Sequence, residues 1–307
     1  MIEIVDLRKR FGATLAVDGI TTSIGAGEFA VLLGQNGAGK TTLLRCLLGL
    51  LAYEGTVRVG GVDVARDGRT ARRLIGYVPQ RPAFPTELTC AETLDLFARL
   101  RGQPAGDASW LARVGLEAQA RTPVRALSGG MRQRLALAVA LQAAPRVILF
   151  DEPAAHLDVA ARRALHRDLQ TLVAEGRTVV LSTHLAAESL QPATRALVMD
   201  RGRLVYDGPP QELGSAVQQR IVFTLNGSGR DDLLTMLAAM ADVTASAAGA
   251  TVVALAPAGR AFDVLAAVAA AGIRPVAVHV EEPAVDSALV AAGRRPGAAR
   301  PAREGRA

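Results

Sequence analysis

The stretch GQNGAGKTT, Gly34 to Thr42, decides how this chain folds. It follows a short apolar run, Phe29 to Leu33, which is typical of a buried parallel strand. It precedes KTTLLRCLLGLL, whose apolar residues recur with helical spacing. The stretch fits the pattern G-x-x-x-x-G-K-[ST] in the strand-to-helix context that this pattern requires. The sequence therefore predicts a phosphate-binding loop.

The predicted loop carries the groups that a nucleotide triphosphate and its metal ion need. Glycines let backbone N–H groups turn toward phosphate oxygens, and the amino end of the following helix adds partial positive charge. We expect Lys40 to reach the β- and γ-phosphates of ATP and Thr41 to offer its hydroxyl to Mg²⁺. The predicted nucleotide-binding residues of the loop are Gly34, Asn36, Gly37, Ala38, Gly39, Lys40, Thr41 and Thr42.

Lys40 is one of only two lysines among the 35 basic residues of the chain. A compact ammonium fits among phosphate oxygens, whereas a broad planar guanidinium does not. The arginine-rich composition thus makes the lysine at this position informative. The other lysine, Lys9, is flanked by arginines and is interpreted as an ordinary surface residue.

Two further apolar runs end in polar residues. Val147 to Phe150 leads into Asp151 and Glu152, and Val179 to Leu181 is followed by His184. Because neighbouring side chains point differently at a strand end, we expect Asp151 to bind Mg²⁺ and Glu152 to polarise the attacking water. Strands that alternate with helices indicate an α/β domain with a largely parallel sheet, whose ligands bind at the carboxyl ends of its strands.

The rest of the chain divides by composition. We expect a nucleotide-binding domain over residues 1–215, interrupted by a helical insertion at about 81–135. Residues 216–293 show the order βαββαβ, which predicts a small α+β domain of ferredoxin-like arrangement. Residues 294–307 form an arginine-rich tail that is expected to be disordered.

Composition excludes several classes of protein. The stretch from Gly293 to Ala307 has a formal charge of +4 out of the total of +6, so the basic pI does not indicate a nucleic-acid-binding body. Cys46 and Cys90 lack the spacing of a disulfide framework or zinc site, which favours a reducing cytoplasm. No run of eighteen apolar residues occurs, so the chain is not expected to leave the cell or cross a membrane by itself.

One motif identifies a family that the chain resembles. LSGGMRQR, Leu127 to Arg134, lies between the phosphate-binding loop and the acidic pair and resembles the signature motif of the ATP-binding cassette (ABC) ATPases. Other elements of that family follow in the family's order, and the resemblance covers about residues 1–215. They are Phe11 before the loop, Gln80 in GYVPQ, Asp158 in AAHLD and His184 in STH.

The resemblance implies roles for these positions. Phe11 would stack on adenine, Gln80 would approach Mg²⁺ and the attacking water, and His184 would contact the γ-phosphate. Asp158 would lie near the nucleotide, although His156 in the same segment departs from the family's usual small residue. The implied catalytic residues are Glu152, His184 and Gln80, and the implied metal-binding residues are Thr41, Gln80 and Asp151.

The signature motif also implies a partner. In the family, Ser128, Gly129 and Gly130 would close over ATP that is held by the phosphate-binding loop of a second chain. Because this chain has one loop and one signature motif, the simplest closed arrangement is a homodimer that encloses two ATP molecules.

The C-terminal residues favour one use of the ATPase. The segment VHVEEPAVDSALVAAG, Val278 to Gly293, resembles the EPSLEDVF ending of ATPase subunits of bacterial ABC-2-type exporters. Glu282 and Pro283 match that ending, whereas Ala284 and Leu289 differ from it. The resemblance implies an ATP-hydrolysing subunit on the inner face of the cell membrane, bound to a separate membrane permease and with no nucleic-acid partner. Three alternatives are an ABC importer ATPase, a soluble ABC ATPase that acts on ribosomes or DNA, and a regulatory module with weak turnover.

Overall fold

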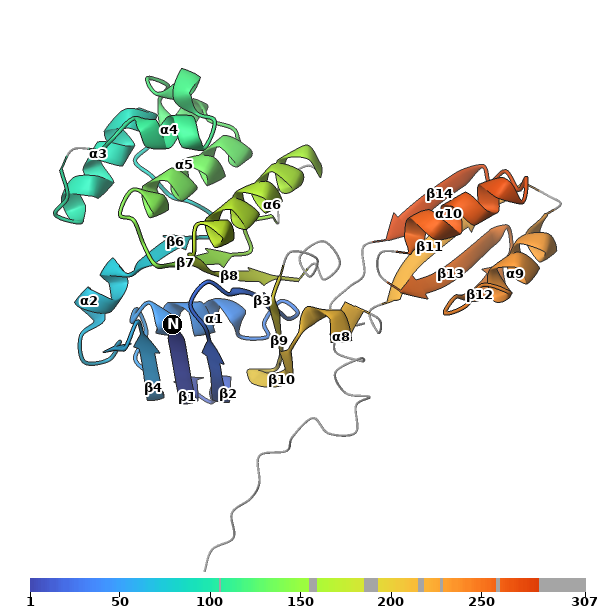
Figure 1. The fold of residues 1–307 in the computed structure, drawn as a ribbon, viewed down its shortest axis with the longest axis horizontal. Coiled ribbons are helices and arrows are strands. Elements are labelled where there is room, and N and C mark those ends of the chain that lie inside the picture. Colours follow the sequence, from blue (N-terminus) through green and yellow to red (C-terminus); the bar gives the residue numbers. More distant parts are fainter. Residues whose placement is uncertain are drawn as a thin grey trace, which may run out of the picture. The chain divides into compact units, whose positions relative to one another are not determined.

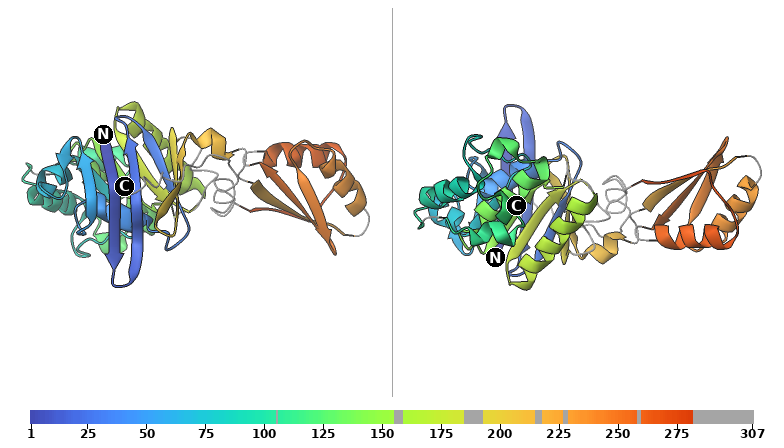
Figure 2. Two further views of the ribbon diagram at one scale, coloured as in Figure 1. Left: turned by 90° about the horizontal axis from the view of Figure 1, so that it is seen from below. Right: turned by 90° about the horizontal axis from the view of Figure 1, so that it is seen from above.

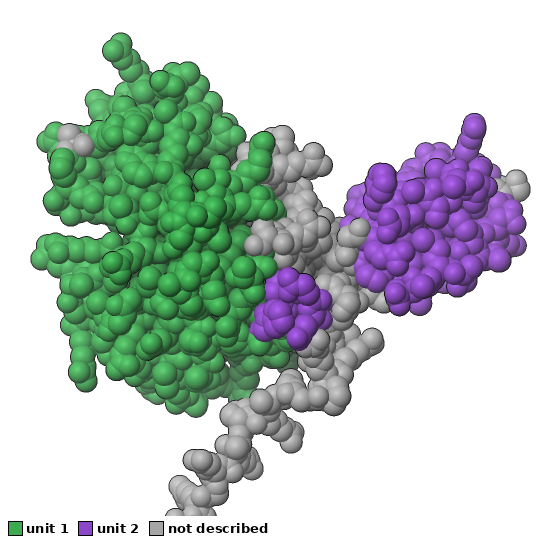
Figure 3. All heavy atoms as spheres, viewed as in Figure 1, with its two compact units in different colours: residues 1–184, 192–207 green, residues 185–191, 208–307 purple. Residues whose placement is uncertain are grey.

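The computed structural model describes residues 1–104, 106–154, 159–184, 193–214, 218–226, 229–257 and 260–281. The chain divides into two compact units (Figure 3). Unit 1 comprises Met1–His184 and Pro192–Asp207, and unit 2 comprises Leu185–Gln191 and Gly208–Ala307. Asp158, His156, the residues that match the exporter ending after Glu281 and the arginine-rich tail all lie outside the described residues.

A six-stranded sheet forms the centre of unit 1, in the order β10-β9-β3-β8-β7-β6. Strands β9, β3, β8, β7 and β6 pair in parallel, as alternation of strands and helices predicts. All five residues of β3 are buried, because helices or strands cover both faces of the sheet there. The strands are β3 (Phe29–Leu33), β6 (Ile75–Val78), β7 (Val147–Asp151), β8 (Thr178–Thr183), β9 (Arg195–Asp200) and β10 (Arg203–Gly208).

A second, antiparallel sheet of unit 1 has the order β2-β1-β4-β5. Helix α1, Lys40–Leu47, lies between the two sheets (Figure 1). Its buried residues Leu43, Leu44 and Leu47 share one apolar core with residues of both sheets. This packing fixes the helix that begins at Lys40. The strands are β1 (Ile2–Phe11), β2 (Thr14–Ile24), β4 (Glu54–Val59) and β5 (Val62–Asp63).

Helices cover the opposite side of the six-stranded sheet (Figure 1). Helix α3 begins with a capping box, in which the Thr89 hydroxyl accepts from the Glu92 N–H and the Glu92 carboxylate accepts from the Thr89 N–H. Helix α5 buries most of its residues and extends past the predicted end of the insertion at 135. The helices of unit 1 after α1 are α2 (Gly68–Arg73), α3 (Cys90–Leu100), α4 (Ser109–Arg113), α5 (Gly129–Leu141) and α6 (Val159–Ala174), with short 3₁₀ turns at Glu117–Gln119 and Val124–Ala126.

Unit 2 has the predicted ferredoxin-like arrangement. Its antiparallel sheet has the order β12-β13-β11-β14, and α9 and α10 cover one face of it (Figure 2). Alternate strand residues such as Ile221, Phe223 and Val252 pack against Leu233 and Val264 of the helices. The elements are α8 (Pro210–Gly214), β11 (Gln218–Thr224), α9 (Arg230–Ala238), β12 (Thr244–Ala248), β13 (Thr251–Pro257), α10 (Ala261–Ala270) and β14 (Ala277–Glu281).

The structure bears on the two cysteines and on membrane-spanning helices. Cys46 and Cys90 are both buried and both free thiols. Within the described part of the chain, no helix combines the length and the apolar character that crossing a membrane requires.

Candidate functional site

The predicted phosphate-binding loop runs from the end of β3 into α1. Gly39, the residue before the helix, has a φ of 103°, and a Cβ atom there would lie 2.3 Å from the carbonyl oxygen of Ala16. Only glycine fits this position, since both the positive φ and the close backbone exclude a side chain. A pocket of about 280 Å³ adjoins the loop. It is lined by Ala16, Gln35, Asn36, Gly37, Gly39, Lys40, Thr41, Thr42, Gln80 and Glu152.

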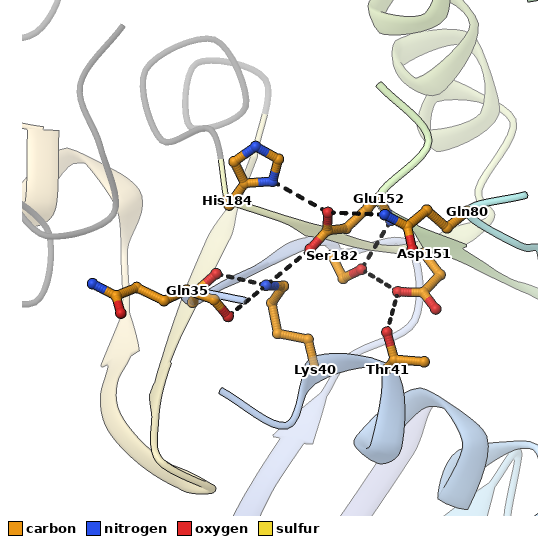
Figure 4. Close-up of polar contacts among 9 residues, drawn as sticks. Gln35, Lys40, Thr41, Gln80, Asp151, Glu152, Ser182 and His184 are labelled. Carbon is orange, nitrogen blue, oxygen red and sulfur yellow. Dashed lines mark hydrogen bonds and ion pairs between the residues drawn. The ribbon is translucent and has the colours of Figure 1, made fainter. Parts of the chain in front are cut away.

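The ammonium of Lys40 is held inside the loop (Figure 4). Its Nζ donates to the carbonyl oxygens of Gly34, at 2.6 Å, and Gln35, at 3.0 Å. It also pairs with Oε1 of Glu152 at 3.0 Å, and both side chains are more than nine-tenths buried. A buried cation needs such oxygen partners, because burial without them costs several kcal/mol. The loop and Glu152 therefore hold the positive charge of Lys40 at the pocket.

Glu152 is the point where the polar side chains of the site converge. Its Oε2 accepts from Nε2 of Gln80 at 3.4 Å and lies 3.2 Å from Nδ1 of His184. The three predicted catalytic residues thus lie together, although Gln80 is 72 residues and His184 is 32 residues from Glu152 in the sequence. The backbone N–H of Glu152 donates hydrogen bonds to Oγ and to the carbonyl oxygen of Ser182. Glu152 itself has a φ of 45°. Non-glycine residues rarely adopt this conformation, and they do so most often at functional sites.

Asp151 lies beside Glu152 and is held by hydroxyl groups. Its Oδ1 accepts from Oγ1 of Thr41 at 3.0 Å and from Oγ of Ser182 at 2.8 Å (Figure 4). Its Oδ2 accepts from the hydroxyl of Tyr77 at 3.2 Å. Burial and the Asp151 carboxylate raise the pKa of Tyr77 well above its usual value. The tyrosine therefore remains a protonated donor at neutral pH.

The oxygen atoms of Thr41 and Asp151 suit Mg²⁺. This ion binds proteins through one or two carboxylates and takes its other ligands from phosphates and water. The described residues contain no cluster of three or more His, Cys, Asp or Glu side chains that could hold a metal without a nucleotide. One buried carboxylate next to one threonine hydroxyl, at the rim of a phosphate loop, is the smaller ligand set that a nucleotide-bound Mg²⁺ needs.

Other predicted site residues lie outside the pocket lining. Phe11 ends β1 and is 49% exposed, while Ser128 and Gly129 are exposed at the start of α5. The Ser128 hydroxyl accepts from the N–H of Met131 and so caps α5. Ala38, within the loop, is buried. Within α5, Gln133 donates to the carbonyl oxygen of Pro79 at 3.4 Å, which links this helix to the segment that carries Gln80.

The structure adds one contact of Lys9 and two residues of the site. Nζ of Lys9 lies over the ring of Phe11, 4.9 Å from the centroid. Ser182 and Tyr77 were missed, although STH and GYVPQ contain them two and three residues before His184 and Gln80. Their proximity to motif residues was the only available signal, since hydroxyl side chains at strand ends have no distinctive spacing.

Known proteins share this fold and these segments. The ABC transporter family profile matches residues 17–155. The "Nod factor export ATP-binding protein I" of Ralstonia nicotianae is 38% identical over 248 residues, which cover 79% of this chain and 77% of that protein. The structure of cbiO1 from Clostridium perfringens, described as part of the ABC transporter complex cbiONQ, aligns with a TM-score of 0.63 and 26% sequence identity. That alignment covers 69% of this chain and 89% of the cbiO1 chain. A dimeric, post-hydrolysis structure of the ATP-binding cassette MJ0796 bound to ADP and Pi has the same TM-score and identity, and its alignment covers 68% of this chain and 99% of the MJ0796 chain.

Proposed function

Because this chain belongs to the ABC transporter family and is an ATP-binding subunit with ATPase activity, we propose that it energises an exporter of the ABC-2 type. The observation that carries the ATP-hydrolysing part of the proposal is the convergence of Lys40, Gln80 and His184 on the Glu152 carboxylate beside the phosphate-binding loop. A relative that is 38% identical over 248 residues is named for the export of Nod factor, which supports export as the direction of transport.

The site geometry supports a division of labour among its residues. Lys40 and the loop amides bind the phosphates, and Thr41, Asp151 and Gln80 would hold Mg²⁺. When bound there, Mg²⁺ would supply positive charge against the negative charge of the phosphate oxygens. Glu152 takes the proton of the attacking water, and Gln80 and His184 hold its Oε2 in place. Phe11 stacks on the adenine ring, and Asp158 belongs to the same nucleotide site.

A second copy of the chain completes the site in this proposal. Ser128 and Gly129 are exposed at the N-terminus of α5, where backbone N–H groups and the helix dipole favour an anion. These residues are not part of the pocket lining in their own chain. We place them, with Gly130, against the γ-phosphate of ATP bound by the partner. ATP then joins the two chains, and hydrolysis loosens them.

The membrane subunit is a separate chain. We propose that a permease binds unit 1 from the membrane, which places this ATPase on the inner face of the cell membrane without nucleic-acid contact. We also propose that residues 1–215 and 216–293 are separate functional domains, followed by a tail at residues 294–307. Export by a complex of this kind requires that the chain distribute with membranes when the permease is present.

Size-exclusion chromatography with light scattering tests the shared site. Full-length Glu152→Gln should form a dimer with ATP and Mg²⁺ and return to a monomer with ADP. Glu3→Gln is the matched control, because Glu3 is an exposed carboxylate of β1 that should not change hydrolysis. A variant that binds ATP but stays monomeric would contradict the dimer. Sedimentation with ribosomes rather than membranes would contradict the transport role.

A further inference from the structure

Tyr77 connects the outer strand of the six-stranded sheet to the predicted metal ligand. It lies on β6, which pairs in parallel with β7 so that Tyr77 is opposite Leu149. Asp151 is two residues beyond Leu149 and therefore on the same face of β7. The tyrosine side chain extends toward the carboxyl end of β7, where its hydroxyl donates to Oδ2 of Asp151 at 3.2 Å.

The two oxygens of Asp151 have different donors. Thr41 and Ser182 both donate to Oδ1, whereas Tyr77 donates to Oδ2. Asp151 is only 2% exposed, so water cannot readily replace a lost donor. A buried carboxylate that loses a hydrogen bond either rotates or loses favourable interaction energy. Tyr77 therefore holds Oδ2 of Asp151, while Thr41 and Ser182 hold Oδ1.

The surroundings of Tyr77 keep its hydroxyl in place. Its ring is partly buried against the apolar core that also contains Val147 and Leu149. A rigid aromatic ring packed on a strand delivers its hydroxyl with little loss of side-chain entropy. A hydroxyl held in this way suits a group whose task is to orient another side chain.

We propose that Tyr77 is a positioning residue, which holds the Asp151 carboxylate in the orientation that binds the divalent cation of the ATP complex. The proposal rests on the proposed role of Asp151 as a metal ligand. It assigns Tyr77 no contact with the nucleotide or the metal. Partners of metal ligands generally change metal affinity or activity by about 10- to 100-fold when they are removed.

The test replaces Tyr77 by phenylalanine in the full-length chain, which removes only the hydroxyl. Binding of Mn²⁺ to the protein–ATP complex, followed by electron paramagnetic resonance, should weaken by about 10-fold. The affinity for ATP in EDTA should stay within about two-fold, because the phosphate loop is untouched, and this also shows that the variant is folded. ATPase activity should recover when the Mg²⁺ concentration is raised.

Tyr53→Phe is the matched control. The hydroxyl of Tyr53 is buried without a hydrogen-bond partner in the described structure, so its removal should leave Mn²⁺ binding unchanged. Asp151→Asn separates the two proposals. If Asp151→Asn abolishes Mn²⁺ binding and Tyr77→Phe leaves it unchanged, the role of Tyr77 is wrong and that of Asp151 stands. If neither variant changes Mn²⁺ binding, the metal site itself is wrong.

Discussion

The two units of this chain bury different kinds of side chain. Among the described residues, every buried polar or charged side chain belongs to unit 1, and five of them, Lys40, Asp151, Glu152, Ser182 and Thr183, lie at or beside the nucleotide site. The described core of unit 2 is apolar throughout and is built from residues such as Phe223 and Val252. Burying charge costs free energy unless each group finds partners, whereas apolar burial stabilises directly.

This difference indicates how the two units are used. Unit 1 retains a costly buried network because its chemistry requires fixed charges and donors. The described core of unit 2 contains no such network, and its apolar packing stabilises the fold of that unit. Substitutions at the site should therefore change turnover more than stability, and substitutions in the core of unit 2 should do the reverse.

Glu152→Gln should have the largest effect on turnover. The amide keeps the shape of the side chain but cannot accept a proton from water, so kcat should fall by about 10²- to 10⁴-fold. The rate of phosphate release by the full-length protein measures kcat, with Glu3→Gln as the control. The melting temperature should change little. A variant that hydrolyses ATP at the original rate would show that Glu152 is not the base.

Phe223→Ala should have the largest effect on stability. Removing a fully buried aromatic side chain typically costs about 3–5 kcal/mol, and hydrogen exchange of the β11 amides reports that loss within unit 2. Phe262→Ala is the matched control, because that ring is 79% exposed.

Alkylation of Cys46 shows whether Phe223→Ala also affects unit 1. Cys46 and Cys90 are buried in unit 1, and burial raises the pKa of Cys46 to about 11, so alkylation of this thiol reports opening of unit 1. Phe223→Ala should leave ATPase activity and Cys46 alkylation unchanged. Faster alkylation of Cys46 would show that the two units unfold together and would remove the distinction between them.

Lys40→Arg tests whether the buried charge of unit 1 needs the shape of lysine. The guanidinium keeps the charge, but it is planar and too broad for the space between the Gly34 and Gln35 carbonyl oxygens and Glu152. We expect turnover to fall by about 10²- to 10³-fold, comparable to the loss of one preorganised electrostatic group. Single-turnover hydrolysis measures the loss. Near-normal turnover would mean that charge alone is sufficient at this position.

The sequence predicted the motif residues of the site but not the contacts that hold them. The loop, the acidic pair and His184 each lie at a strand end, so their meeting at one edge follows from a parallel sheet. The role of Ser182 depends on the register of β7 and β8, which places Asp151 opposite Ser182. No local pattern encodes register between strands that are about thirty residues apart. Tyr77 could not be predicted for the same reason, because its contact with Asp151 depends on the pairing of β6 with β7.

Lys9 gives the smallest expected effect. Its ammonium lies over the Phe11 ring, and such a cation–π contact at an exposed site is worth about 0.5–1 kcal/mol. If Phe11 stacks on adenine, Lys9 holds the ring from one side while the base takes the other. Lys9→Ala should then weaken ATP affinity by about two- to five-fold, as measured with a fluorescent nucleotide. Lys9→Arg should retain the affinity, because a guanidinium also lies well over an aromatic ring, so the two lysines of this chain should respond oppositely to the same exchange.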